Sequence, residues 1–279
     1  MKKKNNKTIR FIRLAVQIFF VLLIALFSLN HYRVEQGLEP LLLGAPSLHA
    51  VCPFGGVVTL YSSITQGTLV KKLHASSLVL MWLVLILTLF FGPVFCGWVC
   101  PLGSVQEWVG KIGKKIFKKK YNTFIPAKID TYLRYIRYAV LVIVVYQTAI
   151  LGKIMFDPYD PYYALFNFWS EELAFSALLI LAITLAGALF VERPWCKYVC
   201  PYGALLGIFN TFRLVKLSRN AATCINCKRC DNVCPMNITP SDDKNVINHQ
   251  CISCLECTSE AECPVADAML LKIRPEVQS

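Results

Sequence analysis

Eight of the thirteen cysteines fall in two short runs near the C-terminus of this 279-residue chain. The first run reads C-x2-C-x2-C-x3-C-P and the second reads C-x2-C-x2-C-x5-C-P. In such a run, three thiolates on one short turn bind three irons of a cubane cluster, and the Cys that precedes Pro binds the other cluster. The pattern therefore predicts two [4Fe-4S] clusters and a protein through which electrons pass.

The crossed pattern assigns four thiolates to each cluster. The cluster I site would consist of Cys224, Cys227, Cys230 and Cys263, and the cluster II site of Cys251, Cys254, Cys257 and Cys234. Pairs of C-x2-C also suit tetrahedral zinc, but a triplet followed by Cys-Pro, present twice, has no use in a zinc site. The second run holds five residues instead of three before its last cysteine, and we expect this insertion to lengthen a surface loop.

Residues 211–279, which contain both runs, are typical of a small two-cluster bacterial ferredoxin of the α+β class. Short alternating stretches flank the cysteines at Arg213–Leu217 and Ala268–Ile273, and the alternation predicts that they pair as edge strands. A domain of about 65 residues buries too little apolar surface to fold alone, so metal binding would supply much of its folding free energy.

Residues 1–210 have the composition of a membrane domain. The chain is 56% hydrophobic, with a mean hydropathy of +0.50. Four apolar runs carry no charge: Leu14–Leu29, Ser77–Phe91, Tyr138–Leu151 and Phe175–Val191. With its flanks each run reaches roughly 20 residues, enough to cross a bilayer as a helix. We predict an α-helical integral membrane domain of about four transmembrane helices, the first a retained anchor because no A-x-A-like cleavage site follows it.

The segments before and between these runs are alternately rich and poor in Lys and Arg. Residues 1–13 carry six and residues 93–137 carry nine, whereas residues 30–76 carry three and residues 152–174 carry one. Because positive charge stays inside, we predict a multi-pass protein of the cell membrane with both termini in the cytoplasm. This bias and contact with anionic membrane lipid account for the net charge of +12. Nothing in the chain predicts nucleic acid as a partner.

A ten-residue motif occurs twice in the membrane part. F-C-G-W-V-C-P-L-G-S at Phe95–Ser104 matches W-C-K-Y-V-C-P-Y-G-A at Trp195–Ala204, and the repeat predicts two similar hairpins related by an axis along the membrane normal. If each motif is helical, its two thiols share one face. Cys96, Cys100, Cys196 and Cys200 would then form a four-thiol site suited to an iron–sulfur cluster or to Cu(I). An alternative is that the four thiols only pack between helices. Disulfides are disfavoured on the reducing side of a membrane.

Three further features carry weaker predictions. The segment after Pro101 has Val105, Trp108, Val109, Ile112 and Ile116 against a lysine face, so we expect an amphipathic helix on the membrane surface. Cys52, in H-A-V-C-P-F-G-G, is either structural or redox-active, and its surroundings are compatible with a re-entrant loop. The aromatic segment at residues 156–170 is typical of an interfacial belt, with a quinol or flavin contact as the alternative.

This combination of four spans, two C-x3-C-P motifs and a C-terminal two-cluster ferredoxin resembles the membrane-bound polyferredoxins of the NapH/NosR type. The resemblance covers the chain from about residue 10 to about residue 274. It implies a protein that carries electrons between a cytoplasmic donor or the quinone pool and an extracytoplasmic flavoprotein or reductase. The covalent-flavin domain of the regulator type is missing from this chain, so a separate flavoprotein would have to supply it.

Two functions therefore stay open on the sequence alone. The first is an electron-transfer subunit, a conduit and not a complete enzyme, with the direction of electron flow undetermined. The second is a factor that reduces copper for assembly into a respiratory enzyme, with the C-x3-C-P thiols binding Cu(I).

Overall fold

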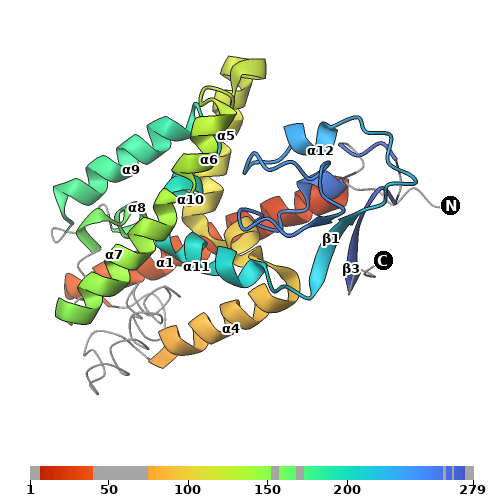
Figure 1. The fold of residues 1–279 in the computed structure, drawn as a ribbon. Helices are drawn as coiled ribbons and strands as arrows, with labels where there is room; N and C mark the ends of the chain where they lie inside the picture. The colour runs from red at the N-terminus through yellow and green to blue at the C-terminus, as the bar shows by residue number, and fades with distance from the viewer. Residues whose placement is uncertain are drawn as a thin grey trace.

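The computed structural model describes residues 7–39, 75–151, 157–167, 173–259, 262–265 and 267–273. A helical part, residues 7–210, precedes a ferredoxin part with one small sheet, residues 211–273. Figure 1 shows the ferredoxin part at one end of the helices, beside the N-terminal half of the first helix. Cys52 and the segment around it, for which a re-entrant loop is predicted, lie outside the described residues.

Each of the four apolar runs forms a helix. These helices are α1 (Lys7–Glu35), α4 (Ala75–Phe91), α7 (Ile136–Leu151) and α9 (Phe175–Ala188). Within the described ranges, α1 alone holds a stretch long and apolar enough to cross a membrane, Ile9–Val34. Apolar stretches of α4 and α9 are shorter, at Leu78–Phe91 and Phe175–Ala188. At 1.5 Å per residue the described lengths of α4, α7 and α9 span roughly 20 to 26 Å, so four crossings remain a prediction.

The long helices point apolar side chains outward and polar ones inward. Phe19, Val79, Val142 and Ile183 are each more than half exposed. Polar residues on the same helices are buried: Gln17, Ser28, Asn30, Thr88 and Thr184. A surface helix of a water-soluble protein shows the reverse distribution.

The helix that follows the first C-x3-C-P motif is not a free surface helix. α5 (Pro101–Phe117) packs between α1 and α9, and its buried face holds Gln106, Glu107, Gly110 and Gly113. A Cβ at Gly113 would collide with the backbone of Leu189, so glycine is what permits this close approach. The helix is present where the sequence predicts it, and its location on a membrane surface stays a prediction. Ile112 and Ile116 do remain outward, as expected.

Short elements complete the helical part. They are η1 (Phe95–Val99), η2 (Lys118–Lys120), α6 (Ala127–Leu133), η3 (Asp157–Tyr159), α8 (Pro161–Phe166), α10 (Pro194–Tyr198) and α11 (Pro201–Asn210). Asp160 caps α8 by accepting a hydrogen bond from the Tyr162 N–H at 3.0 Å. Phe166 is buried against Ile24 of α1, so this part of the aromatic segment belongs to the protein core and not to an interfacial belt.

The ferredoxin part contains a three-stranded antiparallel sheet in the order β2-β1-β3. Its elements are β1 (Val215–Arg219), α12 (Arg229–Asn232), β2 (Asn245–Val246), η4 (Glu256–Thr258) and β3 (Met269–Ile273). Val215 pairs with Ile273 and Arg219 with Met269, which is the pairing expected from the two alternating stretches. The expectation that both are edge strands is wrong for β1, because β2 pairs with its other side. β2 is two residues long, too short for any period in the sequence to reveal it.

Segments that the charge pattern places on one side of a membrane meet at one end of the molecule. The Trp98 indole N–H donates to the Ser253 carbonyl at 3.1 Å, and Arg137 donates to the His249 carbonyl at 2.9 Å. The backbone N–H of Leu214 donates to the carbonyl of Leu89, the last turn of α4, at 2.8 Å. The ferredoxin part is thus docked onto the N-terminal half of α1, the end of α4 and the start of α7 (Figure 1).

Candidate metal centres

The eight cysteines of the two runs line two cavities, four in each. The first cavity is lined by Cys224, Cys227, Cys230 and Cys263, and the second by Cys234, Cys251, Cys254 and Cys257. Each triplet is therefore joined by the last cysteine of the other run, as the spacing predicts. Ligation of a cluster by these thiolates stays a prediction, but the number and type of donors fit a cubane at both places.

The two cysteine loops share one backbone conformation. Asn226 and Lys228 in the first loop have left-handed φ angles of 53° and 56°. Ser253 and Leu255, at the corresponding positions of the second loop, have φ angles of 50° and 60°. Alternation with left-handed residues turns successive backbone N–H groups toward a common centre, a geometry found around iron–sulfur sites. The longer spacing before Cys263 does not disturb this loop.

Positive side chains lie beside the thiols of both sites. Arg213 is buried and approaches the Cys251 sulfur at 3.7 Å, while Arg219 approaches the Cys224 sulfur at 3.9 Å. Burial raises the pKa of the Cys254 thiol to about 11. A thiolate in this environment needs compensating positive charge, which bound iron would supply.

The two sites differ in burial. Cys227 is exposed, whereas Cys251 and Cys257 are buried. The cluster I site is therefore at the surface of the ferredoxin part, and the cluster II site lies in its core against the helical part.

Both C-x3-C-P motifs form a short helix, η1 in the first copy and α10 in the second, and each closes with the same wide turn. The Cys100 N–H donates to the Phe95 carbonyl at 2.8 Å, and the Cys200 N–H donates to the Trp195 carbonyl at 2.9 Å. These hydrogen bonds span five residues, and the last cysteine of each turn has extended backbone and caps the next helix, α5 or α11. The proline then occupies the first helical position, where its missing N–H costs nothing. The first cysteine of each motif lies within the short helix and the second lies beyond its end, so the condition of one continuous helix is not met.

The four thiols of these turns nevertheless lie in one region. Cys96 and Cys200 pack against one apolar cluster, which includes Met81 and Tyr202. Cys100 and Cys200 pack against a second cluster, which includes Leu102. Polar contacts come from Gln106, whose amide donates to the Cys196 sulfur at 3.6 Å, and from the Gly203 N–H, which donates to the Cys200 sulfur at 3.3 Å. Burial raises the pKa of Cys200, and the charges of Cys196, Cys96 and Cys100 raise it further. The thiols are therefore electrostatic neighbours.

None of the described cysteines forms a disulfide. Among the described residues, no group of three or more His, Cys, Asp or Glu side chains lies close enough to hold a single metal ion.

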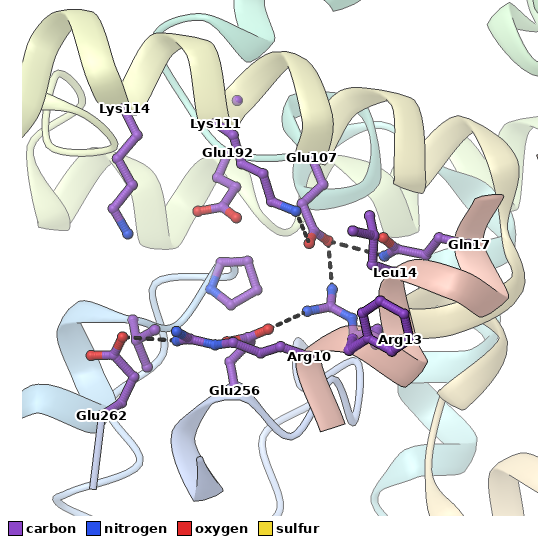
Figure 2. A pocket seen from close by; sticks show the side chains of 14 residues that line it. Arg10, Arg13, Leu14, Gln17, Glu107, Lys111, Lys114, Glu192, Glu256 and Glu262 are labelled. Carbon is purple, nitrogen blue, oxygen red and sulfur yellow. Dashed lines mark hydrogen bonds and ion pairs between the residues drawn. The ribbon is translucent and has the colours of Figure 1, made fainter. Parts of the chain in front are cut away.

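A buried charge cluster joins the helical and ferredoxin parts, and it was not predicted from the sequence (Figure 2). Glu107 of α5 pairs with Arg13 of α1 and with Arg193, each at 2.5 Å, and all three side chains are at most 6% exposed. Arg13 also pairs with Glu256 of the ferredoxin part at 2.8 Å. Although burial opposes ionisation of Glu107, Arg193 and Arg13 hold its pKa below the usual value.

A cavity of about 490 Å³ lies beside this cluster, between α1, α5 and the ferredoxin part. Lys114 and Glu192 point into it (Figure 2). On its opposite wall, Arg10 binds Glu256 and Glu262, both at 2.8 Å. Burial and the nearby charge of Glu107 raise the pKa of Glu192 to about 7.

A second buried network surrounds the second motif. Lys197, between its two cysteines, is fully buried and pairs with Asp130 of α6 at 2.9 Å. The same carboxylate accepts a hydrogen bond from the Tyr198 hydroxyl at 2.5 Å and pairs with Arg134. Lys197 and Tyr198 lie more than 60 residues from Asp130, so sequence spacing gave no signal for these two contacts, whereas Arg134 follows Asp130 at the ordinary i,i+4 helix spacing.

Comparison with known proteins supports the assignment of these centres to an iron–sulfur protein. The family described as a 4Fe-4S binding domain matches residues 73–120 and 173–220, so each match contains one of the two C-x3-C-P motifs. Relatives named as ferredoxin-type proteins match as well, among them NapH of Haemophilus influenzae, which is 30% identical over 185 residues. The chain belongs to the NapH/NosR-like family of ferredoxin-type proteins. No solved structure matches this chain.

Two other relatives match over more of the chain. The putative electron transport protein YccM of Escherichia coli is 28% identical over 229 residues, which make up 80% of this chain and 62% of YccM. The uncharacterised protein MJ0750 of Methanocaldococcus jannaschii is 32% identical over 76% of this chain and 83% of its own length. The match to NapH covers 62% of each protein, so this NapH/NosR-like chain spans less than two thirds of YccM and NapH.

Proposed function

We propose that the protein is a membrane-bound electron-transfer protein with two [4Fe-4S] clusters and a third redox centre at the four thiols of the C-x3-C-P turns. One observation carries the proposal: the thiol sites follow one another from the surface inward. The cluster I site is exposed at Cys227, the cluster II site lies in the core, and Cys96 packs against both that core and the helical core.

Within this proposal the ligands of each cluster are the four cysteines of one cavity, and the domains are residues 1–210 and 211–279. A bound cubane cluster takes up and releases one electron. The protein holds the thiolates in place, excludes water from Cys251 and Cys257, and places Arg213 and Arg219 where they offset the negative charge of the ligands.

Three observations support a multi-pass membrane location with both termini in the cytoplasm. The long helices expose apolar side chains, and α1 is long enough to span a bilayer. Arg10, Arg134 and Arg137, which belong to the Lys- and Arg-rich segments, contact the ferredoxin part. Membrane lipid is then one partner. The redox partners proposed are a cytoplasmic donor or the quinone pool on one side, and an extracytoplasmic flavoprotein or reductase on the other. The names of YccM, an electron transport protein, and of the ferredoxin-type NapH support this assignment.

Metal analysis of the full chain purified without oxygen tests the proposal. We expect about eight iron and eight sulfide from the ferredoxin part, and about four more of each if the C-x3-C-P thiols hold a third cubane. Electron paramagnetic resonance after reduction should then resolve more than one cluster. Copper bound in place of the additional iron would instead favour the metal-assembly function, and zinc without sulfide would refute the cluster assignment.

A further inference from the structure

The two copies of the C-x3-C-P motif differ at the residue that follows the first cysteine. The first copy has Gly97 at this position and the second has Lys197. Both turns close with the same five-residue hydrogen bond, so the backbone does not require the difference. The surroundings of the two residues explain it.

Gly97 lies directly against the second cysteine loop of the ferredoxin part. A Cβ placed on Gly97 would lie 2.5 Å from the Ile252 carbonyl oxygen and 3.5 Å from both Cα and N of Cys254. Because the obstructing atom is backbone, it cannot rotate away as the end of a side chain would. Every residue other than glycine would therefore push the turn and the loop apart.

Neighbouring contacts fix this approach on both sides. The Trp98 indole donates to the Ser253 carbonyl at 3.1 Å, and Arg13 donates to the Gly97 carbonyl at 3.1 Å. Arg193 donates to the Cys96 carbonyl at 2.5 Å. Two buried guanidinium groups and one indole thus hold a three-residue turn against the loop that carries Cys254.

The second copy carries a long charged side chain at the corresponding position. Lys197 is fully buried, and its ammonium group is held by Asp130 of α6. Its neighbour Tyr198 also donates to Asp130, where Trp98 of the first copy reaches the ferredoxin part. The first copy therefore has no side chain at this position, which allows a backbone contact. The second copy has a charged side chain there.

We infer that the contact of Gly97 with Ile252 and Cys254 is the junction through which the cluster II site and the four-thiol site exchange electrons, and that Gly97 is the positioning residue of this junction. The inference rests on the proposed function. Cys96, one residue away, is the C-x3-C-P cysteine that packs against the ferredoxin core. At this junction one electron would pass between the two sites: the site that gives it is oxidised by one unit, and the site that receives it is reduced by one unit. No proton or bond is exchanged.

The test is a size series at Gly97 in the full-length protein. Electron tunnelling slows steeply with distance. Gly97→Ala should therefore slow transfer between the two centres, and the larger Gly97→Val should slow it more. Freeze-quench electron paramagnetic resonance after rapid addition of dithionite would measure the rate. The magnetic coupling between the two centres, which reports their separation, should weaken in the same order. Iron and sulfide content should not change.

Gly187→Ala is the matched control, because a Cβ there meets Pro194 at an ordinary contact distance of 3.5 Å. It should leave both the rate and the coupling at wild-type values. If the Gly97 variants lose iron, Trp98→Phe, which removes the indole hydrogen bond but keeps a ring, should give a smaller loss of rate and coupling.

Unchanged rate and coupling in a fully loaded Gly97→Val protein would overturn the inference, as would an unchanged Trp98→Phe protein where the glycine variants are unstable. Failure of the proposed function has a different signature. In that case the wild-type protein itself would contain about eight iron and show no third centre.

Discussion

The two cysteine cavities of the ferredoxin part have the same local structure and opposite surroundings. Both loops place left-handed residues at equivalent positions, and both receive their fourth cysteine from the other run. The cluster I site is open to solvent at Cys227, with the half-buried Arg219 beside it. The cluster II site is enclosed by the sheet, by Arg213 and by the first C-x3-C-P turn. Local sequence thus specifies two similar sites, and tertiary packing leaves one of them at the surface and encloses the other.

The largest difference between the two sites should appear when a ligand is removed. Cys251→Ala should lose the cluster at the core and loosen the attachment of the whole ferredoxin part, because Cys251 and Cys257 belong to its apolar core. Cys224→Ala should lose about four iron and leave the other cluster in place. Iron content and protease resistance measure both effects. Equal damage from the two variants would contradict the division between a surface site and a core site.

Breaking the buried charge cluster should weaken the docking of the ferredoxin part onto the helices, next to the cluster II site. Glu107→Gln leaves Arg13 and Arg193 buried with reduced compensation, which typically costs about 3 to 5 kcal/mol. Because Arg13 also holds Glu256, we expect protease to release the ferredoxin part from the helices more readily. Lys111→Gln is the control, since its amine is 3.8 Å from Glu107 and its side chain is 56% exposed. A Glu107→Gln protein as resistant to protease as the control would argue against a role for this cluster in docking.

Arg213 and Arg219 allow the two sites to be compared by reduction potential. Arg213→Gln removes a buried positive charge beside Cys251 and should lower the midpoint potential of the core cluster, because positive charge favours the reduced state. Loss of its hydrogen bonds to Ser253 and to the Val246 carbonyl should also cost about 2 to 3 kcal/mol of stability. The corresponding change at the more exposed Arg219 should be smaller in both respects. Redox titration monitored by electron paramagnetic resonance would reveal a reversed order if the surroundings are misassigned.

The smallest effect expected is a dependence of protein stability on pH, caused by Glu192 in the cavity beside the buried charge cluster. The pKa of Glu192 rises from 4.5 to about 7 on folding, so between these values the folded protein binds more protons than the unfolded chain. Its contribution to the free energy of unfolding therefore decreases as pH rises from 4.5 to 7. Glu192→Gln should reduce the change in the midpoint of thermal unfolding with pH across this range. A slope identical to that of the wild type would exclude Glu192 as the titrating group.

Cysteine spacing predicted the grouping of the eight ferredoxin thiols because each motif is a local structure whose geometry repeats between proteins. Alternation predicted the pairing of β1 with β3, and apolar runs predicted four helices. The docking of the ferredoxin part could not be predicted in this way. Its contacts join residues far apart in the chain, such as Arg13 with Glu256, and nothing local marks Glu107 among the lysines of its helix as buried.

The shape of the C-x3-C-P turns was also beyond sequence reasoning. A spacing of four residues indicates one helix face, yet the proline that follows Cys100 starts a new helix and leaves the cysteine extended. The thiols still lie in one region, because both turns border the same two apolar clusters and not because each lies on a regular helix.

The central claim is that the four thiols form one redox centre on the path of electrons across the membrane. Proteoliposomes that contain the full-length protein, with an electron acceptor enclosed on the side opposite the ferredoxin part, test it most directly. Cys100→Ser and Cys200→Ser should each abolish reduction of the enclosed acceptor while both ferredoxin clusters remain present and reducible, and the double variant should add little, since one lost ligand already disables a shared site. Undiminished transfer per ferredoxin cluster in the two single variants would contradict the account.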